Sequence, residues 1–275
     1  MPEGSHVTTA HRETYQRDGV VCLRGLIPSD WIARLRDAVE TVMATPSAFS
    51  RDLAKEAGAT GTYYGELGVC QRDPVLRQFV AQSPIARAGA EIMGARRVRY
   101  FSDQVLVKEP GTSALTLWHQ DFPYFPCDGD QIGSVWLGLD PVSADNGAMS
   151  FVVGSHRMRK LYTPQKFGGG AAYDTDEFDG PAPDIFANPG LYETVCYEME
   201  PGDVTFHHAR TLHGSRGNSS PTVRRRGITV RMAGDDIVWR NRKYLPRGFE
   251  PLADGAPLDG PRYPLLWAGS DATVP

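Results

Sequence analysis

The sequence has no long hydrophobic run and few cysteines. No segment approaches 18 uninterrupted apolar residues, so we expect no membrane-spanning helix. The N-terminal stretch MPEGSHVTTAHRETYQRDG has no apolar core behind a basic start, which argues against a secretory signal and favours a cytoplasmic location. No CxxC pair occurs among the cysteines, which excludes a zinc knuckle and a disulfide framework; they are Cys22, Cys70, Cys127 and Cys196.

The chain also lacks an excess of positive charge. Its 29 Lys and Arg residues against 33 Asp and Glu residues give a net charge of −4, and the one basic run, Arg224 to Arg226, is too short to bind DNA or RNA. A hydrophobic fraction of 41% and a charged fraction of 23% are ordinary for a globular protein. We therefore expect a small-molecule partner, with no nucleic acid and no membrane, and either a monomer or a homodimer.

The first third of the sequence predicts helices and one strand. Apolar residues recur at helical spacing behind Ser29, a plausible N-cap, and two more helices are expected over 73–79 and 83–93. The apolar run at 19–23 predicts a buried strand. The helices are expected to pack outside a sheet.

From Arg97 onward, short strand-like runs alternate with Gly, Pro, Asn and Asp. This pattern predicts a mainly β sandwich or barrel within a single domain over 1–275, with a helical N-terminal layer at 1–95, a core at 96–234 and a C-terminal wrap at 235–275. The Gly-, Pro- and Asp-rich segment 162–191 has no period and predicts a lid or binding loop. The strand-like runs are RVRYFSDQVLVK, GSVWLGL, AMSFVV, ETVCYEM, DVTFHH and RRGITVRM.

His119 and Asp121 form a His-x-Asp pair just after a strand-like run. Residues i and i+2 of an extended chain point the same way, so an imidazole and a carboxylate can face one metal ion. Alone the pair is weak evidence, because about half of sequences with this many His and Asp residues contain one by chance. A histidine hydrogen-bonded to its neighbouring aspartate explains the pair equally well.

A second cluster, 204–215, supplies three candidate histidines. Two imidazoles and one carboxylate are the ligands of oxygen-activating iron(II), because three coordination positions stay open, although zinc hydrolases accept the same set. We choose His213, because it opens the run HGSRGNSSPTVR that ends at Arg224. His207 is then expected as a strand-end core residue, His208 as a polar neighbour, and His156 as structural or near the rim of the site.

Arg224 is the candidate anchor for an anionic cosubstrate. In RRRGITVRM the even positions share one face, and its apolar members Ile228, Val230 and Met232 indicate that this face is buried. A buried guanidinium pairs well with a carboxylate in a two-point fashion, and the distal carboxylate of 2-oxoglutarate is such a partner. A protein carboxylate, or a solvated face after a shift of register, remains the alternative.

One parity of the preceding strand is polar. Inside a barrel this stripe would line a cosubstrate pocket, whereas on the outside it would be a solvated face, and periodicity does not choose between the two. Its members are Tyr100, Ser102, Gln104 and Lys108.

Four segments together resemble the phytanoyl-CoA dioxygenase family of iron(II)/2-oxoglutarate oxygenases, over most of 98–232: QVLVKEPG, WHQDFPYFP, VWLGLDPVSADNGAMSFVVGSH and PGDVTFHHARTLHGSRGNSSPTVRR. The resemblance implies a double-stranded β-helix, or jelly roll, with helices packed on one sheet. It implies iron ligands at His119, Asp121 and His213 and a salt bridge from Arg224 to 2-oxoglutarate. Further cosubstrate contacts are implied at Gln104, Trp136 and Ser215. A lysine that some members place upstream has no counterpart around 63–66.

The resulting hypothesis is an oxygenase that uses Fe(II), 2-oxoglutarate and O2, with ascorbate as support in vitro. It would hydroxylate, desaturate or cyclise at an unactivated C–H bond of a small metabolite, in specialised metabolism or catabolism, and release succinate and CO2. The carboxylate of Asp121 argues against halogenation, because halogenating relatives have a small residue there. The alternatives are a cupin-like metal isomerase or hydrolase that does not use 2-oxoglutarate, and a metal-dependent binding protein without turnover.

Overall fold

Two antiparallel sheets face each other in the computed structural model, which describes residues 6–165, 176–243, 245 and 248–269. The larger sheet has the order β1 (Val20–Leu23), β10 (Val204–His208), β7 (Ile132–Gly138), β12 (Arg225–Ala233), β4 (Arg97–Lys108), β3 (Tyr63–Leu67) and β2 (Ser50–Asp52), and β14 (Leu265–Ala268) also pairs with β4. The smaller sheet has the order β5 (Thr116–His119), β11 (His213–Ser215), β8 (Met149–Val152) and β9 (Thr194–Cys196). The short strands β6 (Cys127–Asp128) and β13 (Val238–Trp239) pair with each other.

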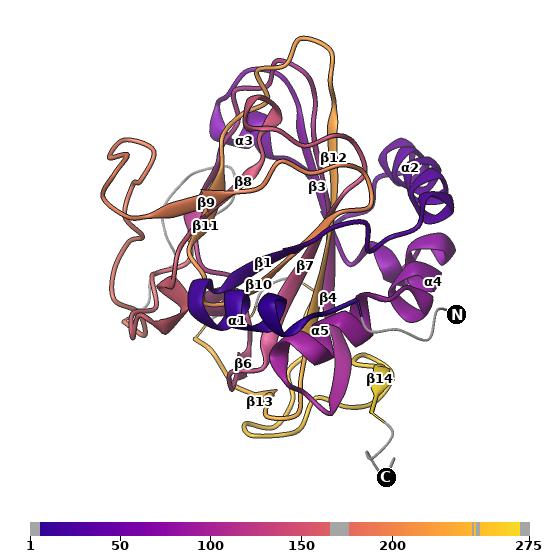
Figure 1. Cartoon of the computed structure of the whole chain (residues 1–275), viewed down its shortest axis with the longest axis vertical. Coiled ribbons are helices and arrows are strands. Elements are labelled where there is room, and N and C mark those ends of the chain that lie inside the picture. Colours follow the sequence, from indigo (N-terminus) through magenta and orange to yellow (C-terminus); the bar gives the residue numbers. More distant parts are fainter. Residues whose placement is uncertain (1–5, 166–175, 244, 246–247, 270–275) are drawn as a thin grey trace.

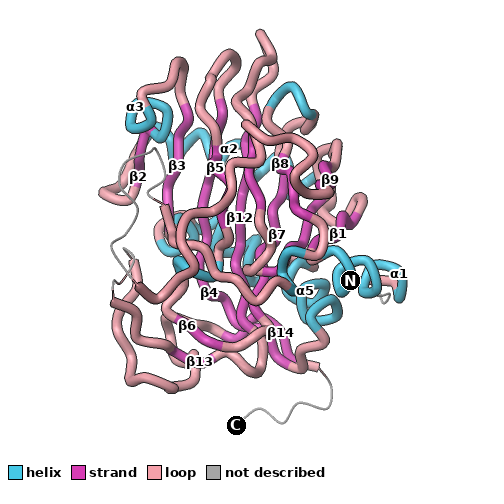
Figure 2. The backbone as a smooth tube through the Cα atoms, turned by 90° about the vertical axis from the view of Figure 1, so that its left-hand side faces the viewer, coloured by secondary structure: helices cyan, strands magenta, loops and turns pink. Residues whose placement is uncertain are grey.

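Helices cover the outer face of the larger sheet. Figure 1 shows α2 (Ser29–Ala44), α4 (Pro74–Gln82) and α5 (Ile85–Met93) on the side of this sheet that faces away from β8, β9 and β11. Figure 2 shows the opposite side, where the smaller sheet is not covered by these helices. The remaining helices are α1 (Thr9–Asp18), α3 (Leu53–Ala57) and the 3-10 turns η1 (Val69–Gln71), η2 (Phe122–Tyr124), η3 (Ala144–Asn146) and η4 (Ser155–Arg157).

The main hydrophobic core lies between these helices and the larger sheet. Ile228 and Val230 of β12 belong to the same buried cluster as Leu35 of α2 and Phe79 of α4. The other face of the sheet is turned toward the smaller sheet and carries polar residues, which are described below. Both faces of the larger sheet are therefore buried, one among apolar side chains and the other among polar ones.

The predicted fold class, a mainly β jelly roll with helices packed on one sheet, is confirmed, and most of the predicted elements form. The three expected helices and the six strand-like runs all form, although Ser29 is the first residue of α2 and makes no cap, while Asp73 caps α4 by accepting from the amide of Leu76. The segment 1–95 is not wholly helical, because β2 and β3 from within it extend the larger sheet. None of the helices in the described ranges has the length and hydropathy needed to cross a bilayer.

The helix-to-sheet core can be tested with two phenylalanines. Phe79 is 0% exposed and packs edge-on against Trp31 at 5.5 Å between ring centroids, whereas Phe49 is 41% exposed. We expect Phe79→Ala to lower the free energy of unfolding by about 3–5 kcal/mol, because it leaves a cavity. Phe49→Ala should change it by less than about 1 kcal/mol. Denaturant titration followed by circular dichroism measures both, and equal effects would contradict this packing.

Candidate active site

His119, Asp121 and His213 converge between the two sheets. His119 ends β5, Asp121 follows two residues later, and His213 begins β11, where it lies directly opposite His119 in the register. One ligand atom from each lies within 4.8 Å of the others, and all three side chains are buried. Oδ1 of Asp121 is 3.7 Å from Nε2 of His119 and 4.0 Å from Nε2 of His213. The structure thus brings together the three predicted ligands.

Backbone carbonyls orient both imidazoles. Nδ1 of His119 is 2.7 Å from the carbonyl oxygen of Leu117, and Nδ1 of His213 is 2.9 Å from that of Thr211. A proton on each Nδ1 donates to the carbonyl and leaves the Nε2 lone pair directed at the centre of the cluster. Metal-binding histidines are held in this manner.

The protonation states fit metal binding. Burial raises the pKa of Asp121, but nearby Arg231 and the imidazoles of His119 and His207 outweigh it and hold the pKa well below its usual range. Burial, together with the neighbouring His119 and His207, holds the pKa of His213 well below its usual range. A carboxylate beside neutral imidazoles is the form that binds a divalent cation. Two nitrogens and one oxygen suit iron(II).

A small cavity of about 30 Å³ adjoins the three ligands. Gln104, Trp136 and Ser215, for which the family resemblance implies cosubstrate contacts, all line it, and those contacts stay a prediction. Its other lining residues are Tyr63, Leu106, Thr116, His119, Asp121, Met149, His207, His213, Arg225, Thr229 and Arg231.

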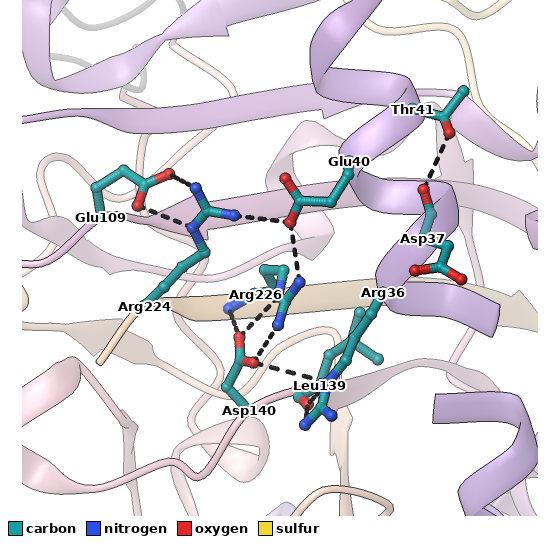
Figure 3. A network of polar contacts seen from close by, with 9 residues as sticks. All are labelled: Arg36, Asp37, Glu40, Thr41, Glu109, Leu139, Asp140, Arg224 and Arg226. Carbon is teal, nitrogen blue, oxygen red and sulfur yellow. Dashed lines mark hydrogen bonds and ion pairs between the residues drawn. The ribbon is translucent and has the colours of Figure 1, made fainter. Parts of the chain in front are cut away.

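Arg224 does not reach this cavity, and the structure corrects that part of the prediction. Its guanidinium pairs with Glu109 at 2.7 Å and with Glu40 of α2 at 2.7 Å, and its side chain is 34% exposed (Figure 3). Arg226 lies on the same side, between Glu40 and Asp140. The alternative of a protein carboxylate as partner therefore holds for Arg224.

Arg225 is the arginine that lines the cavity. The apolar even positions of β12, Ile228, Val230 and Met232, are buried, as predicted, but against the helices. The odd positions Arg225, Thr229 and Arg231 therefore point between the sheets. The apolar residues of β12 correctly predicted that one face is buried. The face toward the cavity, however, is the opposite one, which carries the polar residues. Gly227 also lies on this second face, where a Cβ would lie 2.7 Å from the indole of Trp136. A glycine inside a strand is a sequence signal of such a close approach.

Arg225 is 1% exposed and lies over Trp136, with Cζ 5.3 Å from the ring centroid. Burial lowers its pKa, and the neighbouring Tyr63 offsets part of this effect, but a guanidinium remains charged at neutral pH. Nε and Nη2 of Arg225 and Nε1 of Trp136 have no hydrogen-bond partner among the described residues. Buried donors of this kind are costly unless an anion accepts from them, so this end of the cavity fits a carboxylate.

The polar stripe of β4 is divided between the two faces. Gln104 points into the cavity and accepts from Nη2 of Arg231 at 3.2 Å. Lys108 is buried next to Ser215, a residue that lines the cavity, and its Nζ donates to Oγ of Ser215 at 2.8 Å. Burial holds the pKa of Lys108 well below its usual range. Tyr100 instead belongs to the helix-side core, because a register shift opposite Arg231 and Met232 changes the parity of β4.

The remaining histidines lie in different surroundings. His207 lines the cavity beside Asp121, which the prediction of a plain core residue missed. His208 pairs with Asp130 at 3.3 Å, and His156 lies near Tyr15 at the N-terminal helix, so neither belongs to the ligand cluster.

Two further buried carboxylates lie away from the metal cluster, whereas Tyr124 lies beside it. Glu66 and Asp103 are buried on the helix side, where Arg72 and Tyr100 are their partners. Tyr124 packs edge-on against His119 at 5.9 Å between ring centroids. Its hydroxyl contacts the backbone of Gln165, within the expected lid 162–191. Residues 166–175 of that segment lie outside the described residues, so the lid stays a prediction.

A facing pair of sheets that enclose two histidines, a carboxylate and a buried arginine defines an iron-dependent oxygenase that takes a keto acid cosubstrate. The family described as "Phytanoyl-CoA dioxygenase (PhyH)" matches residues 15–227, and the chain belongs to this family. A probable phytanoyl-CoA dioxygenase of Caenorhabditis elegans is 25% identical over 86% of this chain and 78% of its own. An ectoine dioxygenase of Bordetella parapertussis is 26% identical over 77% of this chain and 71% of its own.

Solved structures agree with this assignment. The α-ketoglutarate-dependent epimerase SnoN from nogalamycin biosynthesis superposes with a TM-score of 0.74 and 26% identity over 94% of this chain and 98% of its own. The same enzyme has been solved with Fe3+, α-ketoglutarate and nogalamycin RO. The protein is therefore a 2-oxoglutarate-dependent dioxygenase that uses iron and 2-oxoglutarate, which removes the alternative of an isomerase or hydrolase without a keto acid.

The ligand set can be tested by metal binding alone. We expect His119→Ala and His213→Ala each to weaken Fe(II) binding by more than about 100-fold, since the loss of a direct ligand should exceed the 10–100-fold effect of losing a supporting contact. His208→Ala removes an equally buried imidazole outside the cluster and should bind Fe(II) like the parent protein. Anaerobic calorimetry measures these affinities, and a loss in His208→Ala equal to that in His213→Ala would contradict the assignment.

Proposed function

We propose that the protein oxidises a C–H bond of a small molecule at an iron(II) held by His119, Asp121 and His213, with 2-oxoglutarate anchored by Arg225. The observation that carries this proposal is the position of Arg225, whose unsatisfied donors line the same cavity as the ligand cluster. The cavity thus offers a metal site at one place and a carboxylate site at another, as a chelating keto diacid requires.

The chain's own residues define what is bound and how. Arg225 and Nε1 of Trp136 would hold the distal carboxylate, with the hydroxyls of Tyr63 and Thr116, 2.8 Å from each other, beside them. Gln104 and Ser215 line the same cavity as Arg225 and the ligands. Burial of all these groups excludes water, which strengthens the pairing of a guanidinium with a carboxylate.

Iron held by His119, Asp121 and His213, together with 2-oxoglutarate held by Arg225, would supply the oxidising chemistry, with succinate and CO2 as coproducts. We propose hydroxylation as the outcome, with desaturation or cyclisation as variants in which the substrate loses two hydrogen atoms. The carboxylate of Asp121 occupies the position that a halide would need, so halogenation is not expected.

Epimerisation is a further candidate, favoured by one comparison. SnoN is named as an epimerase, and its similarity extends over nearly the whole of both chains. An epimerised product has the same mass as its substrate. The substrate is proposed to be a small metabolite, because relatives such as the ectoine dioxygenase are named for one.

The anchor role has a direct test in two adjacent arginines. Arg225→Gln should raise the Kd for 2-oxoglutarate roughly 100-fold, because removal of a buried charge from a carboxylate costs about 2–5 kcal/mol. Arg224→Gln is the matched control, since its partners Glu40 and Glu109 lie outside the cavity. Isothermal titration of the anaerobic Fe(II) protein measures both. The opposite ranking would return the role to Arg224.

The reaction itself can be tested with a panel of small metabolites. We expect succinate release that depends on Fe(II), 2-oxoglutarate and the added compound, with ascorbate present to keep the iron reduced. Mass spectrometry of the same reactions separates the outcomes: gain of one oxygen atom indicates hydroxylation, and loss of two hydrogen atoms indicates desaturation or cyclisation. Succinate release with a stereoisomer of the substrate, of unchanged mass but separated from it by chromatography, indicates epimerisation, in which ascorbate supplies the two electrons that reduce the second oxygen atom of O2 to water. Binding of a compound without any O2 consumption would instead indicate a protein without turnover.

A further inference from the structure

The two oxygens of the Asp121 carboxylate have different surroundings. Oδ1 faces Nε2 of His119 and of His213. Oδ2 faces away from them and accepts from Oγ of Ser134 at 2.7 Å, with Nε of Arg231 at 3.5 Å and Nε2 of His207 at 3.6 Å. One oxygen therefore points at the metal position and the other at three potential donors.

These three donors form one row across the larger sheet. Ser134 on β7 lies opposite His207 of β10 on one side and opposite Arg231 of β12 on the other. Partners at the same register position project to the same face of a sheet, so the row converges on Asp121 from three neighbouring strands. All three side chains are buried, and Ser134 is 0% exposed.

His207 supplies a second observation. Both of its ring nitrogens are buried without a hydrogen-bond partner among the described residues, and Oδ2 of Asp121 lies just beyond hydrogen-bond distance. Its ring centroid is 4.6 Å from that of His213. A buried imidazole with unsatisfied nitrogens is costly. A small movement toward Oδ2 would satisfy one of them.

We propose that Ser134, Arg231 and His207 are positioning residues that keep Asp121 a one-oxygen ligand, an inference that rests on the iron site proposed above. Donors on Oδ2 oppose rotation of the carboxylate toward a chelate in which both oxygens bind the metal. Two imidazoles and one oxygen leave three positions of an octahedron open. A chelating keto acid would need two of these positions and O2 the third, so a second oxygen from Asp121 would compete with them.

The test uses two buried serines of the same row. Ser134→Ala removes the hydrogen bond to Oδ2, whereas Ser102→Ala makes the same change opposite Arg231 on β4, without a contact to Asp121. The anaerobic protein is titrated with Fe(II) and then 2-oxoglutarate. The visible charge-transfer band of the chelate, the Kd for 2-oxoglutarate and the Fe(III)/Fe(II) midpoint potential are recorded for each variant.

For Ser134→Ala we expect a shifted charge-transfer band and a lower Fe(III)/Fe(II) midpoint potential. The Kd for 2-oxoglutarate should rise roughly 10-fold, which is typical for the loss of a contact that supports a metal ligand. The potential falls because a carboxylate with fewer donors gives more electron density to the metal and stabilises Fe(III). Ser102→Ala should match the parent protein in all three readouts. A purely structural role for Ser134 would change the melting temperature and leave the band and the potential unchanged, which would overturn the proposal.

A second pair of variants tests the imidazole. His207→Gln keeps a donor and His207→Phe removes it at similar volume, so Gln should lie closer to the parent protein in the band and the potential. An equal band position and an equal midpoint potential in the two variants would show that His207 does not position Asp121. Failure of the proposed function looks different, because the parent protein itself would then show no charge-transfer band with Fe(II) and 2-oxoglutarate.

Discussion

A carboxylate buried as deeply as Asp121 is stable only when cations and donors surround it. Burial alone would keep the acid protonated, and a protonated acid is a poor metal ligand. The nearby guanidinium of Arg231, together with the imidazoles of His119 and His207, outweighs this effect and holds the pKa well below its usual range. Because Arg231 lies on β12 and His207 on β10, the charge state of the metal ligand depends on the register of the larger sheet.

That register is itself fixed by the different side chains on the two faces of β12, one apolar and one polar. Ile228 and Val230 pack against the helices, whereas Arg225, Thr229 and Arg231 face the cavity. A shift by one residue would place apolar side chains beside the metal ligands and two guanidinium groups in the hydrophobic core. The apolar core and the polar site therefore stabilise the same arrangement of one strand.

Much of this arrangement could be predicted from the sequence. The ligands His119, Asp121 and His213 follow from residue types and from a family resemblance, and the strands follow from apolar runs between turn residues. Arg224 could not be distinguished from Arg225, because a run of three arginines does not show which side chain faces the cavity. An apolar face shows that a strand is buried, but in a sheet buried on both sides it does not show which face meets the ligand.

His207 was missed for a related reason. Among three histidines in one cluster, sequence spacing does not show which ring lies beside Asp121, since that depends on pairing with Ser134 across β7. Glu66 and Asp103 illustrate the converse, because they are buried carboxylates whose partners come from η1, its flanking residues and β4, and they serve the helix-side core. Cross-strand partners, which only a structure reveals, decide these roles.

The run of three arginines has a consequence for how such an enzyme can vary. Arg224 and Arg226 join β12 to Glu40 of α2, whereas Arg225 between them faces the cavity. The same three residues therefore attach the helical layer and recognise the keto acid. Because a shift of β12 by one residue would reverse its two faces, a change in the length of the preceding loop is tolerated only where the loop itself absorbs it.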